Sequence, residues 1–230
     1  MALILRLDVD KPYGHHTLIR RVASKIVENS IIPPPQIGYL SHLTTTLEIL
    51  DQYQIKAILY FRRCSVPTPS SLEAIRKSGH QIGWHAENTM SIESLRDELE
   101  FAKTKLGNLH SFSKHGSGEK KLGYHHYFPY EPEKYIHWSK TLGVKFPFGN
   151  GVAKKKPDQM NDFFPDMFWI EKNYRSDEYN SIQKLVEDSK QSDIVVISHP
   201  ENIVTSKQCR DDLVSICKLA RQMNVKWINN

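Results

Sequence analysis

Short apolar segments alternate with amphipathic helical segments along this chain, and this alternation is the feature that most constrains the fold. It is typical of βαβ units around a mostly parallel sheet, so the sequence predicts an α/β protein. A length of 230 residues fits one domain, and we expect a single domain over residues 1–230. The predicted strands are Leu3 to Val9, Lys56 to Phe61, Gln81 to Trp84, Phe168 to Ile170, Asp193 to Ile197 and Val225 to Ile228, with weaker candidates at His110 to Lys114 and Val144 to Phe148.

The helices between these strands carry recognisable start and stop signals. The clearest spans Ser91 to Leu106, where apolar residues recur at steps of three and four and Gly107 follows. Ser70 with Glu73 has the spacing of a capping box and predicts another helix start. Two further helices are predicted from Pro132 to Leu142 and from Lys207 to Met223.

Composition narrows the class of protein and of partner. The net charge of +5 is compatible with an anionic partner. The short basic run Lys154 to Lys156 has no arginine-rich or aromatic residues interleaved with it, so we interpret it as a solvated loop and not as a nucleic-acid site. No apolar run is long enough for a membrane span, and no export signal is visible, so a cytoplasmic location is expected. Cys64, Cys209 and Cys217 have no metal-type spacing and are expected to be reduced. The sequence leaves the oligomeric state open.

Polar side chains follow several predicted strands. Asp8 and Asp10 end the first strand, His85 and His199 each follow an apolar strand, and His115 follows a weaker one. Ligands of parallel α/β folds bind at the carboxyl ends of the strands. The sequence therefore predicts that these groups gather at one face.

Two of these residues are carboxylates two positions apart. Asp8 and Asp10 point to the same side of an extended chain, about 6–7 Å apart, and like charges repel unless a cation compensates. A divalent metal would compensate this repulsion, with one carboxylate as its ligand and the other free to act as a base. The alternative reading makes Asp8 a strand-end acid and Asp10 a loop cap ahead of Pro12. Asp10, His85 and one more imidazole would form a three-ligand catalytic metal site.

Three stretches together resemble a known family. "LDVDKP", "SGHQIGWHAENTMSIESLRDELEFAKTKLG" and "ISHPENI" are similar to motifs of the polysaccharide-deacetylase superfamily, also called NodB-homology or carbohydrate esterase family four. The resemblance implies a distorted (β/α) barrel and a divalent metal, usually zinc, held by an Asp and two His. It implies removal of acyl groups from N-acylated sugars, or cleavage of other C–N bonds in relatives. It makes Asp8 the general base, Asp10 and His85 metal ligands, and His199 the general acid.

One position departs from the family pattern. The family's second metal histidine lies four residues after the first, and here that position is Thr89. His115, flanked by glycine, could supply the missing imidazole. Glu87 or Asn88 could ligate instead, or the metal could be lost. We favour His115.

These observations lead to a functional hypothesis. The chain is expected to be a metal-dependent hydrolase that removes an N-acyl group from an acylamino sugar or glycan precursor, with Asp8 as base and a metal-bound water as nucleophile. A non-catalytic carbohydrate-binding protein and a hydrolase of a non-sugar C–N bond are the alternatives. The basic charge is compatible with an anionic sugar substrate. Arg62 or Arg63, after the second strand, could pair with a substrate anion, or could be solvated or held in a structural ion pair.

Overall fold

The computed structural model describes residues 1–29, 38–150, 164–175 and 181–228. The chain divides into two compact units, and each is described by itself. Unit 1 comprises Met1–Asp8, His42–Ile58 and Gly151–Asn230, and unit 2 comprises Val9–Ser41 and Leu59–Asn150. The single catalytic domain over residues 1–230 remains a prediction, and the run Lys154 to Lys156 lies outside the described residues.

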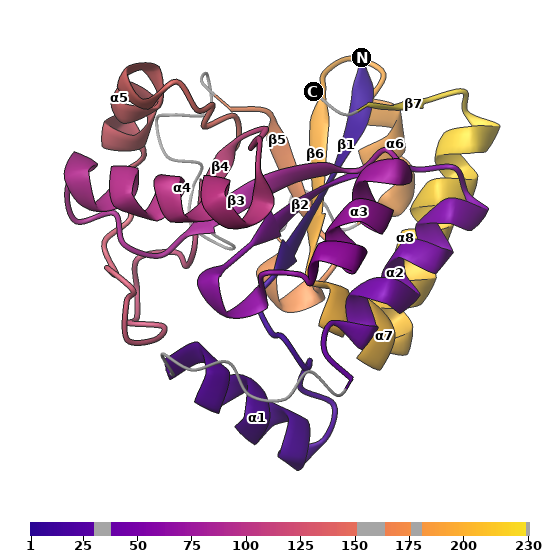
Figure 1. Cartoon of the computed structure of the whole chain (residues 1–230). Coiled ribbons are helices and arrows are strands. Elements are labelled where there is room, and N and C mark those ends of the chain that lie inside the picture. The colour runs from indigo at the N-terminus through magenta and orange to yellow at the C-terminus, as the bar shows by residue number, and fades with distance from the viewer. Residues whose placement is uncertain (30–37, 151–163, 176–180, 229–230) are drawn as a thin grey trace. The chain divides into compact units, whose positions relative to one another are not determined.

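Parallel strands form the centre of unit 1. β1 (Ala2–Val9) pairs in parallel with β6 (Ile194–Ser198) and with β7 (Lys226–Ile228), and β6 pairs in parallel with β5 (Asp166–Trp169) (Figure 1). Every residue of β1 and β6 is buried, which is the burial expected of parallel strands covered on both faces. Arg6 and Asp8 share this burial, and a buried charge requires a partner.

Helices complete unit 1. α8 contacts α6 and α7, and its apolar stripe of Leu213, Ile216 and Ala220 is buried. Cys209 and Cys217 both lie in α8, and all three cysteines of the chain are free, as predicted. The elements are α2 (Ser41–Gln52), the 3-10 helix η3 (Lys172–Tyr174), α6 (Ile182–Asp188), α7 (Pro200–Thr205) and α8 (Lys207–Gln222).

Unit 2 carries a second set of strands and helices. β3 and β4 pair in parallel, and α4 lies along β3 (Figure 1). β2 precedes them and belongs to this unit from Leu59 onward. The elements are α1 (Leu18–Asn29), β2 (Ala57–Phe61), the 3-10 helix η1 (Arg63–Ser65), α3 (Pro69–Lys77), β3 (Gln81–Ala86), α4 (Ile92–Leu106), β4 (Phe112–Lys114) and α5 (Pro132–Leu142).

The capping residues and apolar periodicity of the sequence predicted the positions of most of these elements correctly. α4 begins after Ser91, whose side chain accepts from the Ser94 N–H at 3.2 Å, and ends at Gly107 with φ 68°. α3 begins two residues earlier than the capping box predicts, because Pro69 takes the first helical position and Thr68 becomes the cap. The weak strand at Val144 to Phe148 is wrong, since that segment contributes an isolated bridge between Ser111 and Lys145.

One helix of unit 2 has an unusual surface. α1 packs Val27 against Tyr13 and Cys64, but Leu18, Ile19, Val22 and Ile26 on the same helix are exposed. Among the described residues, no helix combines the length and the apolar character that crossing a bilayer requires. A cytoplasmic location stays a prediction.

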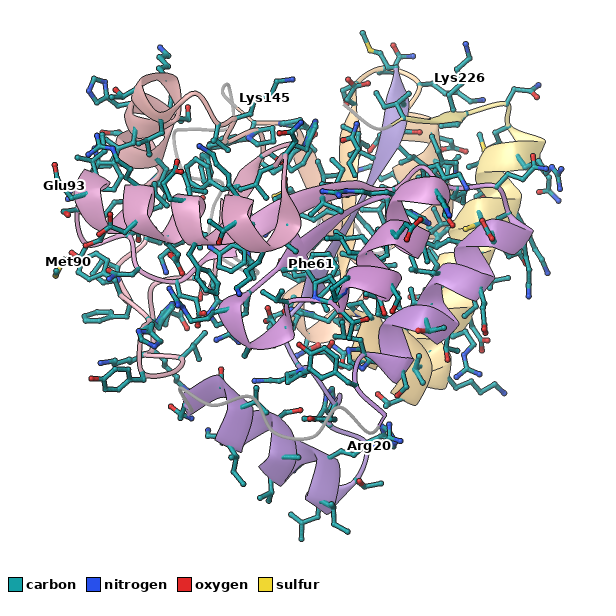
Figure 2. The ribbon with its side chains drawn as sticks, in the orientation of Figure 1. Arg20, Phe61, Met90, Glu93, Lys145 and Lys226 are labelled. Carbon is teal, nitrogen blue, oxygen red and sulfur yellow. The ribbon has the colours of Figure 1, made fainter. Side chains whose placement is uncertain are left out.

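A glycine in β3 allows close packing inside unit 2. Figure 2 shows Phe61 among interior side chains and Met90 at the surface. A Cβ added at Gly83 would lie 2.5 Å from Tyr60 Cε1 and 2.9 Å from the Ser111 carbonyl oxygen. These contacts are too short for any side chain, so the strands at this point accept glycine alone.

Gly83→Ala is therefore expected to lower the free energy of unfolding by about 2–3 kcal/mol, because overpacking forces Tyr60 off Ser111. Urea unfolding measures the change. Gly143→Asn is the matched control, since Gly143 has φ 64°, which asparagine tolerates, and nothing lies within 4 Å of the added Cβ. Equal effects of the two substitutions would show that the contact around Gly83 has been misread.

Candidate metal centre

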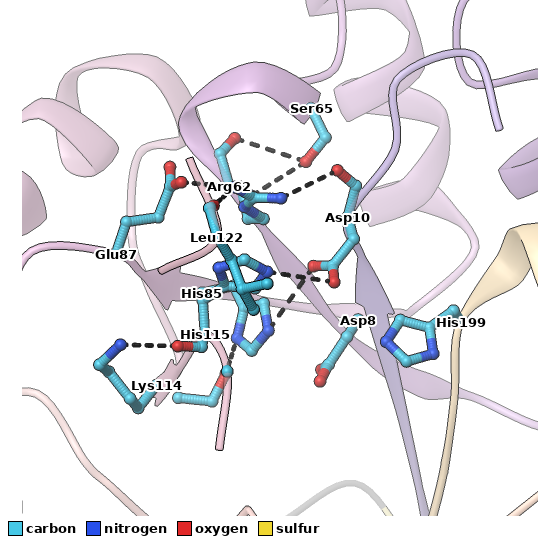
Figure 3. A network of polar contacts seen from close by, with 12 residues as sticks. Asp8, Asp10, Arg62, Ser65, His85, Glu87, Lys114, His115, Leu122 and His199 are labelled. Atoms are coloured by element: carbon cyan, nitrogen blue, oxygen red, sulfur yellow. Dashed lines mark hydrogen bonds and ion pairs between the residues drawn. The ribbon is translucent and has the colours of Figure 1, made fainter. Parts of the chain in front are cut away.

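Three side chains predicted from strand ends converge in unit 2. Asp10 directly follows β1, His85 lies in β3, and His115 directly follows β4. Asp10 Oδ1 lies 3.6 Å from His85 Nε2, and Asp10 Oδ2 lies 3.4 Å from His115 Nε2 (Figure 3). One ligand atom from each residue lies within 4.8 Å of the others. The two imidazoles and one carboxylate are buried or nearly so.

Strand register explains why the two histidines meet. His85 in β3 is the cross-strand partner of Ser113 in β4, and His115 lies two residues beyond Ser113. Residues two apart on extended chain share a face, so His115 returns to the face of His85. The Nδ1 atom of His85 shares a hydrogen bond of 2.7 Å with Ser113 Oγ, which leaves Nε2 toward Asp10. A partner on the far ring nitrogen is typical support for a metal-ligating histidine.

The backbone of His115 is held from both sides. Its N–H donates to the Ala86 carbonyl at 2.9 Å, and its carbonyl accepts from Lys114 Nζ at 2.6 Å and lies 2.7 Å from His126 Nε2. The next residue, Gly116, has φ 79°, and a Cβ there would lie 2.9 Å from His126 Nε2. Glycine is therefore required where the chain turns away from the site.

The electrostatics of the cluster favour the metal-binding protonation states. Burial alone would raise the pKa of Asp10, but His115, His85 and the Arg62 guanidinium hold that pKa well below its usual range. Burial and Arg62 lower the pKa of His115, against the opposite effect of Asp10. An ionised carboxylate and neutral imidazoles are the forms that bind metals.

Arg62 supports this cluster from the end of β2. Its side chain is fully buried, donates to the Asp10 carbonyl oxygen at 3.3 Å, and forms ion pairs with Glu28 at 3.0 Å and Glu87 at 2.5 Å. Glu98 in turn accepts the Glu87 N–H at 3.0 Å. Of the two readings of Arg62, the structural ion pair is therefore the one that the structure shows.

The donor set fits a divalent transition metal. Two ligand atoms at zinc distances and tetrahedral angles lie about 3.3 Å apart, close to the 3.4 Å and 3.6 Å that separate Asp10 from the imidazole nitrogens. Two imidazoles with one carboxylate also suit iron, cobalt or nickel, so the donor set alone does not select zinc.

The competing ligand candidates have other partners. The Glu87 carboxylate pairs with Arg62, and the backbone N–H of Asn88 donates to Glu98. The hydroxyl of Thr89 shares a hydrogen bond of 3.1 Å with the Tyr135 hydroxyl. The structure thus brings His115, and neither Glu87 nor Thr89, into the cluster around Asp10.

Asp8, in unit 1, differs from the expectation of a free carboxylate. Arg6 Nε donates to Asp8 Oδ1 and Arg6 Nη2 donates to Asp8 Oδ2, both at 2.8 Å, with both side chains buried. Arg6 and Asp8 are two residues apart on β1, so the strand period places them on one face. The bidentate pair fixes the plane of the Asp8 carboxylate.

His199 lies beside Asp8 within unit 1. Leu7 and Ser198 are register partners in β1 and β6, so Asp8 and His199 are the next residues on neighbouring strands, as Figure 3 shows. His199 Nδ1 lies 3.1 Å from Glu171 Oε1, and its ring stacks on Trp169 with centroids 5.7 Å apart. These contacts fix the orientation of the imidazole.

Glu171 is the functional candidate that sequence reasoning missed. Its Oε1 accepts from Ser198 Oγ, the His199 N–H and Asn202 Nδ2, each at 2.9 Å. Burial would raise its pKa, but the hydrogen bonds and charge of His199 lower the pKa to about 2. The signal was available, because Glu171 directly follows the predicted strand Phe168 to Ile170.

Comparison with solved structures identifies the fold. The chain is similar to the catalytic domain of a peptidoglycan N-acetylglucosamine deacetylase from Eubacterium rectale, with a TM-score of 0.54, 14% identity, and coverage of 99% of this chain and 87% of that chain. A polysaccharide deacetylase from Bacillus cereus gives a TM-score of 0.50 and 11% identity over 98% and 89%. A 4-α-glucanotransferase from Thermococcus litoralis gives 0.52 and 11% over 99% and 37%.

Identities this low establish the fold alone. The predicted fold class, a distorted (β/α) barrel of the polysaccharide-deacetylase type, is confirmed. No model of a known family matches the sequence, and no curated protein matches it either.

His115→Ala is expected to abolish stoichiometric binding of zinc, because it leaves two ligands. Thr89→Ala is the matched control and is expected to retain the metal, since Thr89 faces Tyr135. Metal analysis after dialysis measures both. Unchanged metal content in His115→Ala would remove His115 from the ligand set, and loss in Thr89→Ala would implicate the family position.

Glu171→Gln tests the buried carboxylate through pH. A folded pKa of about 2 means that ionised Glu171 stabilises the fold by about 3 kcal/mol at neutral pH. This stability is present above the unfolded pKa near 4.5 and is lost as pH falls towards 2. The wild type is expected to exceed Glu171→Gln in unfolding free energy at pH 7, with the difference narrowing below about pH 4.5. Exposed Glu187→Gln is the control, and a difference independent of pH would contradict the assignment.

Proposed function

We propose that this chain, which has the fold of the polysaccharide deacetylases, is a metal-dependent hydrolase that removes an N-acyl group from an acylamino sugar or glycan precursor. The observation that supports this most strongly is the convergence of Asp10, His85 and His115. The fold alone does not decide the chemistry, because a glucanotransferase shares it.

Asp10, His85 and His115 would hold the metal, with zinc as the first candidate. When bound, a divalent cation supplies Lewis acidity at the acyl carbonyl and lowers the pKa of water. The protein's own contribution here is to present two imidazoles and a carboxylate, and burial with the charge of Arg62 lowers the pKa of His115, which favours its neutral form.

Asp8 is proposed as the general base. It stands two residues before Asp10, the separation at which side chains of an extended segment point to one side. Arg6 binds both oxygens of the Asp8 carboxylate and compensates its charge. A carboxylate so fixed can take the proton of the attacking water without reorienting.

His199 is proposed as the general acid for the leaving amine. Glu171 lies 3.1 Å from His199 Nδ1, so it can stabilise an imidazolium and hold the ring in one orientation. Nε2 then remains as the nitrogen that gives a proton to the amine. Glu171 is a positioning residue in this scheme, since it acts through His199.

Two alternatives remain as outcomes of the test. A non-catalytic carbohydrate-binding protein was suggested by Thr89, and the presence of His115 in the cluster weighs against that reading. A hydrolase of a non-sugar C–N bond would use the same groups on a different substrate.

The decisive experiment combines metal content with amine release. Zinc-loaded protein is offered N-acetyl and N-formyl amino sugars and a cyclic amide. We expect amine release from an acylamino sugar. Asp8→Asn should keep the metal while the rate falls about 10²- to 10⁴-fold, the usual contribution of a general base. His85→Ala should lose both metal and activity.

Exposed Asp97→Asn is the control carboxylate and should change neither quantity. Metal without turnover on any amide would support the binding protein. Turnover of the cyclic amide alone would exclude an acylamino sugar as substrate and support a hydrolase of a non-sugar C–N bond. Loss of metal in Asp8→Asn would exclude Asp8 as a base separate from the ligands.

A further inference from the structure

A cavity of about 560 Å³ opens beside the candidate metal centre within unit 2. Asp10 and His115 line it, together with residues of α1 and of the loop that follows β4. The cationic residues among its lining are three lysines: Lys11, Lys25 and Lys121. A substrate amide placed at the metal centre would therefore share this cavity with three ammonium groups.

Both walls of the cavity are held in place. In α1, Ser24 Oγ donates to the Gly14 carbonyl at 2.9 Å, which fixes the helix that carries Lys25. In the loop, the Leu122 N–H donates to His126 Nδ1 at 3.0 Å, which fixes the residue next to Lys121. The lysine stems therefore start from defined positions on α1 and on the loop after β4.

The charges of the cavity do not cancel. Its two acids are Asp10 and Glu28. Asp10 faces the imidazoles, and Glu28 pairs with buried Arg62 at 3.0 Å and with Lys11 at 3.5 Å. Within the described ranges no ion pair is recorded for Lys25 or Lys121. These two ammonium groups remain to attract an anion.

The placement of the cations indicates the kind of anion. Arginine's planar fork binds carboxylate and phosphate alike through two parallel hydrogen bonds, whereas lysine binds phosphate as a point charge with three donors. The arginine nearest this cavity, Arg62, is already engaged by Glu28 and Glu87. Lysines on two walls suit a group whose oxygens point in several directions, as those of phosphate do.

We propose that the substrate is an acylamino sugar bearing a phosphate group, with Lys25 and Lys121 binding the phosphate while the amide lies at the metal centre. This inference rests on the proposed function for the amide and on the cavity for the phosphate. The phosphate could be free or could link the sugar to a lipid. α1, which carries Lys25, also exposes Leu18, Ile19, Val22 and Ile26, which a lipid chain could contact.

Binding is tested with two sugars that differ only in the phosphate. Calorimetry compares glucosamine 1-phosphate with glucosamine, both products that the enzyme cannot hydrolyse further. We expect the phosphate to tighten binding at least about tenfold at low salt, and high salt to erode this preference. In Lys25→Ser/Lys121→Ser the preference should fall to about twofold or less.

Arg21→Ser/Lys120→Ser is the matched control, because it removes the same charge from the same helix and loop at residues outside the cavity lining. It should keep the preference. Equal binding of the two sugars by the wild type, or a preference that survives loss of Lys25 and Lys121, would overturn the proposal. A preference lost equally in the control would also overturn it, since net charge alone would then explain the effect.

A kinetic arm separates this inference from the proposed function. Amine release is measured from N-acetylglucosamine and its 1-phosphate. A phosphate preference in binding without hydrolysis of either sugar would sink the hydrolase and keep the phosphate site. Hydrolysis of both sugars at equal kcat/KM, unaffected by the lysine variant, would exclude the phosphate site and keep the hydrolase.

The source of the phosphate is resolved with a dodecyl phosphodiester of N-acetylglucosamine in phosphatidylcholine vesicles. A lipid-linked substrate predicts faster amine release from the vesicles than from the soluble phosphate, and a loss of that advantage in Val22→Ser/Ile26→Ser. A free sugar phosphate predicts the opposite order and no effect of the α1 variant. In both cases the lysine variant should lower the rate.

Discussion

The buried Asp10 carboxylate and the groups that compensate its charge organise unit 2. A buried anion is costly unless it is paired, and Asp10 meets His85 and His115 while Arg62 binds its carbonyl. Arg62 is itself a buried charge and needs Glu28 and Glu87. The ends of β2, β3 and β4, together with α1, are thereby joined through alternating charges. Such a connected network specifies one arrangement of the strand ends.

The resemblance to the family leaves one ligand position open, and the strand next to β3 offers a candidate for it. In the family pattern the second histidine lies four residues after the first, but here Thr89 turns to Tyr135. Parallel register places His115 on the face of His85 instead, because Ser113 is the partner of His85. The proposed ligand set would thus contain two imidazoles and one carboxylate, with the second imidazole supplied by the residue after β4.

Sequence reasoning succeeded where a local rule was sufficient. The positions of Asp10, His85 and His115 follow from the rule that functional groups lie at the carboxyl ends of parallel strands, and α4 follows from its periodicity and caps. The partners were not predictable in the same way. Glu171 and His199 are 28 positions apart, and only the pairing of β5 with β6 brings them together. The strand period places Arg6 on the same face as Asp8. The pairing was still not expected, because a buried strand rarely carries a charged side chain.

Two carboxylates in unit 1, Asp8 and Glu171, have different partners: a guanidinium and an imidazole. The difference between these partners fits the different roles proposed for Asp8 and His199. Asp8, the proposed base, is held through both oxygens by the Arg6 guanidinium, which cannot lose its proton, so its carboxylate has a fixed cationic partner. Glu171 contacts the imidazole of His199, whose proton can move, so this carboxylate would support the proposed general acid. The proposed base and the proposed acid therefore differ in their partners, which are Arg6 on β1 and Glu171 after β5, although Asp8 and His199 lie at the ends of the neighbouring strands β1 and β6. That difference is what an amide hydrolase needs, because the attacking water must lose a proton and the leaving amine must gain one.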